Sequence, residues 1–205
     1  MAKNYSTTID TGNFIPIIIL IIFLCIGFIP NLEAVDKIAP QWLAMSFINL
    51  ISLIYISFNH KKFGSILNYN LKTPISIVYL LFILWASASY FYAINSTEVL
   101  VNIARQANIF LMFVNMGILI YRIRSKAILI SYFILIILSI ETYAVLDQAT
   151  EMIKNFGSIQ SGSLKGVTAN RNITAFSIAI KIPFILFIIY HSKKGFIKVF
   201  SGLLI

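Results

Sequence analysis

The stretch that decides the fold is Ala127–Asp147, which reads AILISYFILIILSIETYAVLD and carries only two charged residues, Glu141 and Asp147. A helix of roughly 20 mostly apolar residues crosses the hydrocarbon core of a bilayer. The stretch is therefore predicted to be a transmembrane helix. Five other segments have the same character and are also predicted spans: Phe14–Pro30, Pro40–Phe58, Thr73–Phe91, Val99–Ile120 and Ile173–Tyr190.

The composition agrees with a membrane protein. The chain is 59% hydrophobic and 11% charged, whereas soluble domains have about 25% charged residues. A seventh apolar run, VFSGLLI, starts after Lys198 and stops at Ile205, which is too short to cross a bilayer. The predicted fold is an all-α polytopic transmembrane helix bundle with six complete spans and a truncated seventh. We expect residues 1–205 to be one transmembrane domain, the N-terminal part of a longer protein.

Lysine and arginine are unevenly distributed over the connections. Ten of the sixteen lie in the N-terminal tail and the even-numbered connections: Lys3, Lys61, Lys62, Lys72, Arg122, Arg124, Lys126, Lys193, Lys194 and Lys198. The odd-numbered connections hold only Lys37, Lys154, Lys165 and Arg171. Because cytoplasmic loops are rich in these residues, the pattern predicts a cytoplasmic N-terminus. Topology thus accounts for most of the net charge of +9, and no nucleic-acid partner is expected.

Three charged residues lie inside predicted spans: Arg105, Glu141 and Lys181. At 1.5 Å per residue, they lie roughly 9 to 12 Å below the outer surface. Charges within the membrane are costly and are therefore functional candidates. Two interpretations stay open at this point. The charges line an outward-facing polar cavity, or Arg105 and Lys181 extend to the headgroups while Glu141 is a structural counter-ion.

Each of these charges belongs to a polar stripe on one face of its helix. The stripes are Arg105, Asn108 and Asn115; Glu141 and Gln148; and Thr174, Ser177 and Lys181. Pro183 is expected to loosen the helix just after Lys181. The stripes favour a polar cavity lined by the fourth, fifth and sixth spans.

The connection 148–172 is predicted to be a long outer loop, and loops of this length are usually functional or disordered. Its second half carries Lys165 and Arg171 close to the start of the sixth span. Asn172 is a preferred N-cap residue, and a helix N-terminus favours anions. Gly166 allows a tight turn or a close approach to a ligand. The loop therefore predicts a phosphate or diphosphate site, with an ordinary solvated loop as the alternative.

The run KGVTANRNITA, Lys165–Ala175, resembles the entry to the conserved domain of the O-antigen ligase and O-antigen polymerase family. In that family a basic residue and a glycine precede an N-x-N-x-x-A pattern and a membrane helix with a proline. The matching residues are Asn170, Asn172, Ala175 and Pro183. Arg171 departs from the pattern, since many members have proline or another residue there. Weaker similarities are an outer loop with Asp36 and Pro40, and the aromatic helix end and polar loop in Trp85–Leu100.

The resemblance implies a glycosyltransferase in a bacterial inner membrane that joins a glycan carried on a polyprenyl diphosphate to a lipid or glycan acceptor. Basic residues hold the diphosphate, and here these would be Arg105, Lys165, Arg171 and Lys181, with Glu141, Gly166, Asn170 and Asn172 in support. No metal and no cofactor is expected. The family's suspected base is a histidine in a later loop. His60 and His191 are both predicted to be cytoplasmic, so the base is expected beyond Ile205, and residues 1–205 alone are expected to be inactive.

Two other functions stay open from the sequence. In a transporter or flippase, the charges within the membrane would line a substrate path. In a non-catalytic membrane scaffold, they would serve only structure.

Overall fold

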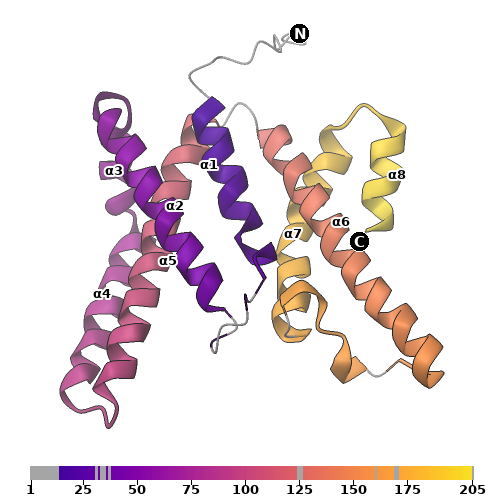
Figure 1. Ribbon diagram of the computed structural model, residues 1–205. Helices are drawn as coiled ribbons and strands as arrows, with labels where there is room; N and C mark the ends of the chain where they lie inside the picture. Colours follow the sequence, from indigo (N-terminus) through magenta and orange to yellow (C-terminus); the bar gives the residue numbers. More distant parts are fainter. Residues whose placement is uncertain are drawn as a thin grey trace. The chain divides into compact units, whose positions relative to one another are not determined.

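The computed structural model describes residues 14–30, 32, 36, 38–123, 127–159, 161–168 and 171–204 (Figure 1). The described residues form helices and turns and contain no β-strand. The chain divides into two compact units, which are described separately. Unit 1 comprises residues 1–26 and 30–124, and unit 2 comprises residues 27–29 and 125–205.

Unit 1 contains α1 (Phe14–Cys25), α2 (Ala39–Phe58), α3 (His60–Leu71), α4 (Pro74–Ala88) and α5 (Ser96–Arg122), with a 3-10 turn, η3 (Ser89–Phe91), after α4. The 3-10 turn η2 (Ile26–Phe28) follows α1. Two of these helices, α4 and α5, follow a residue whose side chain caps the helix N-terminus. Thr73 accepts a hydrogen bond from the Ser76 amide ahead of Pro74, and Asn95 accepts one from the Glu98 amide.

Helix α3 was not predicted, because 59–72 was interpreted as a connection. Phe63 is only 1% exposed and packs with Ile56 of α2 and with Phe110, Val114 and Ile118 of α5. Lys61 and Lys62 are exposed. The segment is therefore a short amphipathic helix that is too short to cross a bilayer. Its apolar side packs on α2 and α5.

A ladder of amide side chains joins α2 to α5. Asn115 donates to Asn49 Oδ1 at 2.9 Å, Asn49 donates to Asn108 Oδ1 at 2.6 Å, and Asn108 donates to Ser46 Oγ at 2.8 Å. Asn49 and Asn115 are buried. Buried amides must bond to each other where no water reaches them. The ladder therefore fixes the rotation and register of the two helices.

Asn49→Leu is expected to destabilise unit 1 by about 1 to 3 kcal/mol, because it leaves partners on both sides without their hydrogen bonds. Thermal unfolding in detergent micelles measures the effect. Asn102→Leu is the control, since Asn102 is an exposed asparagine on α5 that takes no part in the ladder. Equal melting temperatures for the two variants would contradict the structural role of the ladder.

Unit 2 contains α6 (Ala127–Phe156), α7 (Arg171–His191) and α8 (Gly195–Leu203), with short 3-10 turns η5 (Ser161–Ser163) and η6 (Gly166–Thr168) between α6 and α7. The core consists of Leu135 and Leu138 of α6 against Ile185 and Ile188 of α7. Ile197 and Leu204 pack on the same cluster. The α6–α7 pair is thus the framework of this unit (Figure 1).

The predicted extent of the loop 148–172 is wrong. Helix α6 continues to Phe156, because Gln148–Lys154 contains good helix formers and no glycine or proline. It ends where Gly157 has φ of 68°, and the Gly157 amide donates to Ile153 O at 2.9 Å. Pro183 lies inside α7, which continues unbroken to His191, and the loosening expected after Lys181 stays a prediction.

Five helices in the described part of the chain are long and apolar enough to cross a membrane. They are Ala39–Phe58, Pro74–Phe91, Ser96–Arg122, Ala127–Phe156 and Arg171–His191. The apolar helix Phe14–Phe28 is shorter. Large apolar side chains cover the outside of these helices, and in α4 only Ser76 is buried. An outward-facing apolar surface of this extent is typical of a membrane protein.

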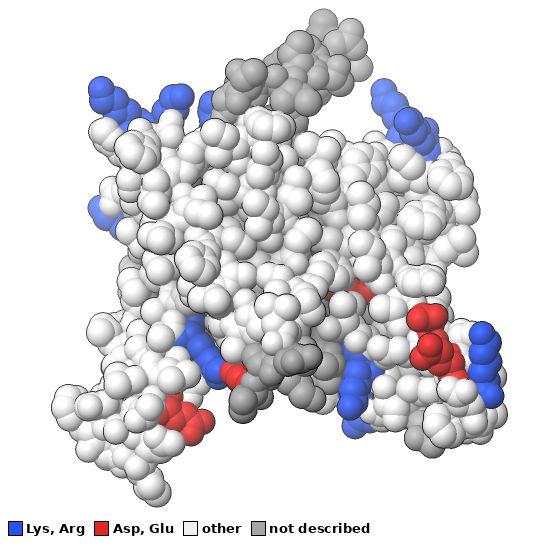
Figure 2. All heavy atoms as spheres, viewed as in Figure 1, with Lys and Arg blue, Asp and Glu red and all other residues white. Residues whose placement is uncertain are grey.

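Among the described charged residues of each unit, one end carries only Lys and Arg, and the other end carries Asp and Glu together with Lys and Arg (Figure 2). In unit 1 the exposed Lys61, Lys62 and Lys72 lie where α2 ends and α4 begins, while Glu98 lies at the opposite end, in the first turn of α5. In unit 2 the acidic Asp147 and Glu151 lie toward the end of α6. This sorting has the pattern from which a cytoplasmic N-terminus was predicted, and the orientation stays a prediction.

Candidate functional site

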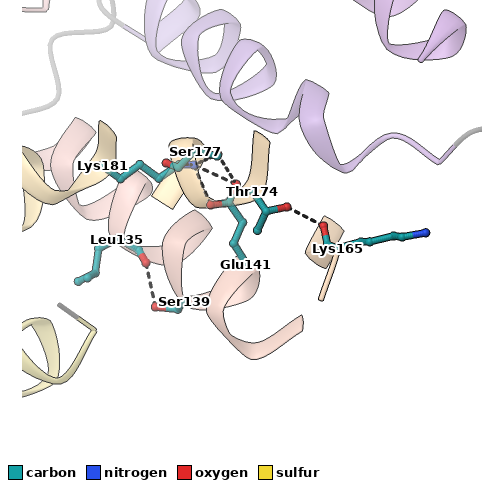
Figure 3. A network of polar contacts seen from close by, with 7 residues as sticks. All are labelled: Leu135, Ser139, Glu141, Lys165, Thr174, Ser177 and Lys181. Atoms are coloured by element: carbon teal, nitrogen blue, oxygen red, sulfur yellow. Dashed lines mark hydrogen bonds and ion pairs between the residues drawn. The ribbon is translucent and has the colours of Figure 1, made fainter. Parts of the chain in front are cut away.

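A charged pair within the membrane-spanning part of unit 2 joins α6 to α7 (Figure 3). Lys181 Nζ lies 2.9 and 2.7 Å from the two carboxylate oxygens of Glu141. The Lys181 and Glu141 side chains are only 15% and 9% exposed. Ser177 donates to Glu141 Oε1 at 3.1 Å, and the ammonium also donates to the Ser177 carbonyl at 3.0 Å. The cation and the anion are therefore paired and hydrogen-bonded, as burial of charge requires.

Near the start of α7, the backbone of the dipeptide Lys165–Gly166 is held by two side chains. Gln148 Oε1 of α6 accepts from the amides of Lys165 at 3.0 Å and Gly166 at 2.9 Å, and Gln148 Nε2 donates to the Gly166 carbonyl at 3.3 Å. Thr174 Oγ1 of α7 donates to the Lys165 carbonyl at 2.6 Å. All four backbone polar groups of the dipeptide thus have partners.

Gly166 is the residue type that this attachment requires. Its φ is +56°, a conformation that side chains disfavour. A Cβ atom at this position would lie 2.7 Å from Thr174 Cγ2 and 3.2 Å from Val145 Cγ2. The dipeptide therefore lies tightly against the ends of α6 and α7.

The two cationic side chains near the start of α7, Lys165 and Arg171, face outward. Both Lys165 and Arg171 are exposed, and the Lys165 side chain points away from the Glu141–Lys181 pair (Figure 3). Arg171 is the first residue of α7, and its Nη1 lies near Gly162, 3.7 Å from where a Cβ would stand. Two full positive charges are therefore accessible at the N-terminal end of α7, the end that favours anions.

The predicted N-cap position of Asn172 is wrong, because Asn172 lies inside α7. Helix α7 begins at Arg171, so Asn172 lies in the first turn. Two asparagines flank Arg171, and cap preference alone does not choose between them. The predicted supporting residue Asn170 lies outside the described residues.

Arg105 has a carboxylate partner of its own, within unit 1. Its Nη2 donates to Asp36 Oδ2 at 2.6 Å, and the guanidinium lies 5.6 Å from the centre of the Trp42 ring. The Arg105 and Asp36 side chains are 33% and 44% exposed. This contact is a partly solvated ion pair in the N-terminal part of α5, and the depth of Arg105 in a membrane stays a prediction. Its sharing of one cavity with the cations of unit 2 stays a prediction.

The predicted stripes of α6 and α7 meet each other. Glu141 and Gln148, seven residues apart, bond to the α7 stripe and to the loop before it. Sequence reasoning missed Asn49 as the partner of Asn108 and Asn115, and missed Gln148 as the attachment point of the loop. A polar residue inside an apolar span was the available signal for Asn49. Nothing local in the sequence marks Gln148 as a partner of residues 165 and 166.

Among the described residues, no cluster of three or more His, Cys, Asp or Glu side chains is arranged to hold a metal ion. Comparisons with models of known protein families, with curated proteins and with solved structures found no match.

Proposed function

We propose that this chain is part of a membrane glycosyltransferase of the O-antigen ligase type, which transfers a glycan from a polyprenyl diphosphate to a lipid or glycan acceptor. The observation that carries the proposal is the fixed loop Lys165–Gly166, which presents an exposed cation near the start of α7, a helix whose first residue is the exposed Arg171. Positive charge at this place suits a diphosphate, both when the donor binds and when the diphosphate leaves. The resemblance of Lys165–Ala175 to that family supports the same assignment.

Lys165 and Arg171 are the primary diphosphate contacts in this proposal. Arg105 and Lys181 belong to the same proposed site, but each is paired with a carboxylate that a ligand would have to displace. Glu141 holds Lys181, Gly166 allows the loop geometry, and Asn170 and Asn172 shape the loop. The catalytic base is assigned to no residue of this chain.

The proposed setting is a bacterial inner membrane, with the N-terminus in the cytoplasm and the loop between α6 and α7 in the periplasm. In this arrangement the apolar helix Phe14–Phe28 is the first of six spans. The basic residues near α3 and between α7 and α8 then lie on the cytoplasmic side.

Binding of undecaprenyl diphosphate to the 205-residue chain in phosphatidylcholine nanodiscs tests the proposal. We expect Lys165→Ala and Arg171→Ala each to raise Kd about tenfold, since one charge-assisted hydrogen bond contributes about 1.5 kcal/mol. Lys193→Ala and Lys194→Ala are matched controls, because both residues are exposed lysines beyond the opposite end of α7. Equal losses for all four variants would indicate unspecific attraction to an anionic lipid and would overturn the site.

Transfer distinguishes the proposed enzyme from the transporter and the scaffold. The whole protein, given a polyprenyl-diphosphate-linked glycan and an acceptor, is expected to form the acceptor-linked glycan and release the polyprenyl diphosphate. Movement of the intact donor between leaflets, with its glycosidic bond unbroken, would support a flippase instead.

A further inference from the structure

We infer that Gln148 and Thr174 are positioning residues, which hold the Lys165 backbone so that only the lysine side chain remains to be ordered when the diphosphate binds. Neither residue is a proposed ligand contact. This inference rests on the proposed function for the identity of the anion, and on the hydrogen bonds of the loop for the positioning itself.

Every backbone N–H and C=O group of Lys165 and Gly166 has a hydrogen-bond partner. Gln148 satisfies both amides and the second carbonyl of the dipeptide, and Thr174 satisfies the first carbonyl. The two residues come from different helices, so the dipeptide is held from two sides. Lys165 then has only its own side-chain rotamers to restrict when an anion binds. A flexible loop would have to lose backbone freedom as well when the anion binds.

The Glu141–Lys181 pair is a second connection between α6 and α7, about two helical turns from Gln148 and Thr174. Thr174, Ser177 and Lys181 share one face of α7 (Figure 3), and Glu141 and Gln148, seven residues apart, share one face of α6. The salt bridge therefore fixes the rotation of both helices one to two turns below the loop. That rotation places Gln148 and Thr174 where the dipeptide can bond to both of them.

The test is a double-mutant cycle on undecaprenyl diphosphate binding in nanodiscs. Gln148→Met keeps the length of the side chain and removes its three hydrogen bonds, and it is expected to raise Kd about tenfold. In the Lys165→Ala background the same change is expected to have no further effect, because Gln148 acts through Lys165. Thr174→Val is expected to behave in the same way. Thr150→Val, at an exposed threonine of α6, is expected to leave Kd unchanged.

Amide hydrogen exchange gives a readout that does not depend on the ligand. The amides of Lys165 and Gly166 are expected to exchange at least about fivefold faster in Gln148→Met, since one lost hydrogen bond is worth about 1 kcal/mol. Amides in the core of α6 are expected to keep their rates.

The outcomes separate this inference from the function on which it rests. Failure of the unchanged chain to bind undecaprenyl diphosphate would overturn both, even with the exchange result as expected. Binding by the unchanged chain, with losses from Gln148→Met and Lys165→Ala that multiply fully, would overturn the positioning role alone. Unchanged exchange at Lys165 and Gly166 in Gln148→Met would also overturn it.

Discussion

Lys181→Met is expected to destabilise unit 2 by about 3 to 5 kcal/mol, because it leaves the Glu141 carboxylate buried without its cation. The Glu141 side chain is 9% exposed, and its remaining side-chain partner is the Ser177 hydroxyl. A hydroxyl donor cannot offset the desolvation of a full negative charge in a membrane-spanning helix pair. Unfolding of the chain in mixed micelles of increasing denaturant content measures the loss.

Two variants serve as controls for this prediction. The double variant Glu141→Met and Lys181→Met removes both charges, and we expect it to recover most or all of the stability, since a buried ion pair can be replaced by apolar side chains at little cost. Lys198→Met removes an exposed lysine and is expected to be neutral. A single variant Lys181→Met as stable as the unchanged chain would show that Glu141 reaches water in the folded protein.

Gly166→Ala is expected to have the second largest effect, about 2 to 5 kcal/mol on the local stability of the loop. The left-handed backbone costs a non-glycine residue about 1 to 2 kcal/mol. The new methyl group also meets Thr174 Cγ2 at 2.7 Å and Val145 Cγ2 at 3.2 Å, and such overpacking costs about 1 to 3 kcal/mol. Both atoms belong to short branched side chains, which cannot move aside without shifting their helices.

Gly157→Ala separates the two contributions to this effect. Gly157 also has positive φ, 68°, but a Cβ there would meet no atom within 4 Å. It is therefore expected to show the backbone cost alone. Protease cleavage within 157–170, compared between the two variants, reports the opening of the loop. A Gly166→Ala loop no more sensitive than that of Gly157→Ala would argue against close packing of the dipeptide on Thr174.

Hydrophobic length and helical periodicity are local properties, and they were sufficient for the coarse fold. Ala127–Asp147 was recognised as a span because its apolar residues are contiguous, and α6 does cross this range. The stripe of Thr174, Ser177 and Lys181 was recognised because a helix repeats every 3.6 residues. Helix propensity is a local property as well, and it favours a helix through Gln148–Lys154, where α6 continues.

Partners across helices required the three-dimensional structure. Lys181 could have paired with a headgroup or with Glu141, and only the rotation of α7 against α6 shows the carboxylate within 2.7 Å. Gln148 reaches Lys165 and Gly166 because a turn brings residues 17 and 18 positions away back to the helix end. Asn49 meets Asn108 and Asn115 because α2 and α5 pack in one register. A linear pattern states which face of a helix is polar, but the packing of whole helices decides which two polar faces meet.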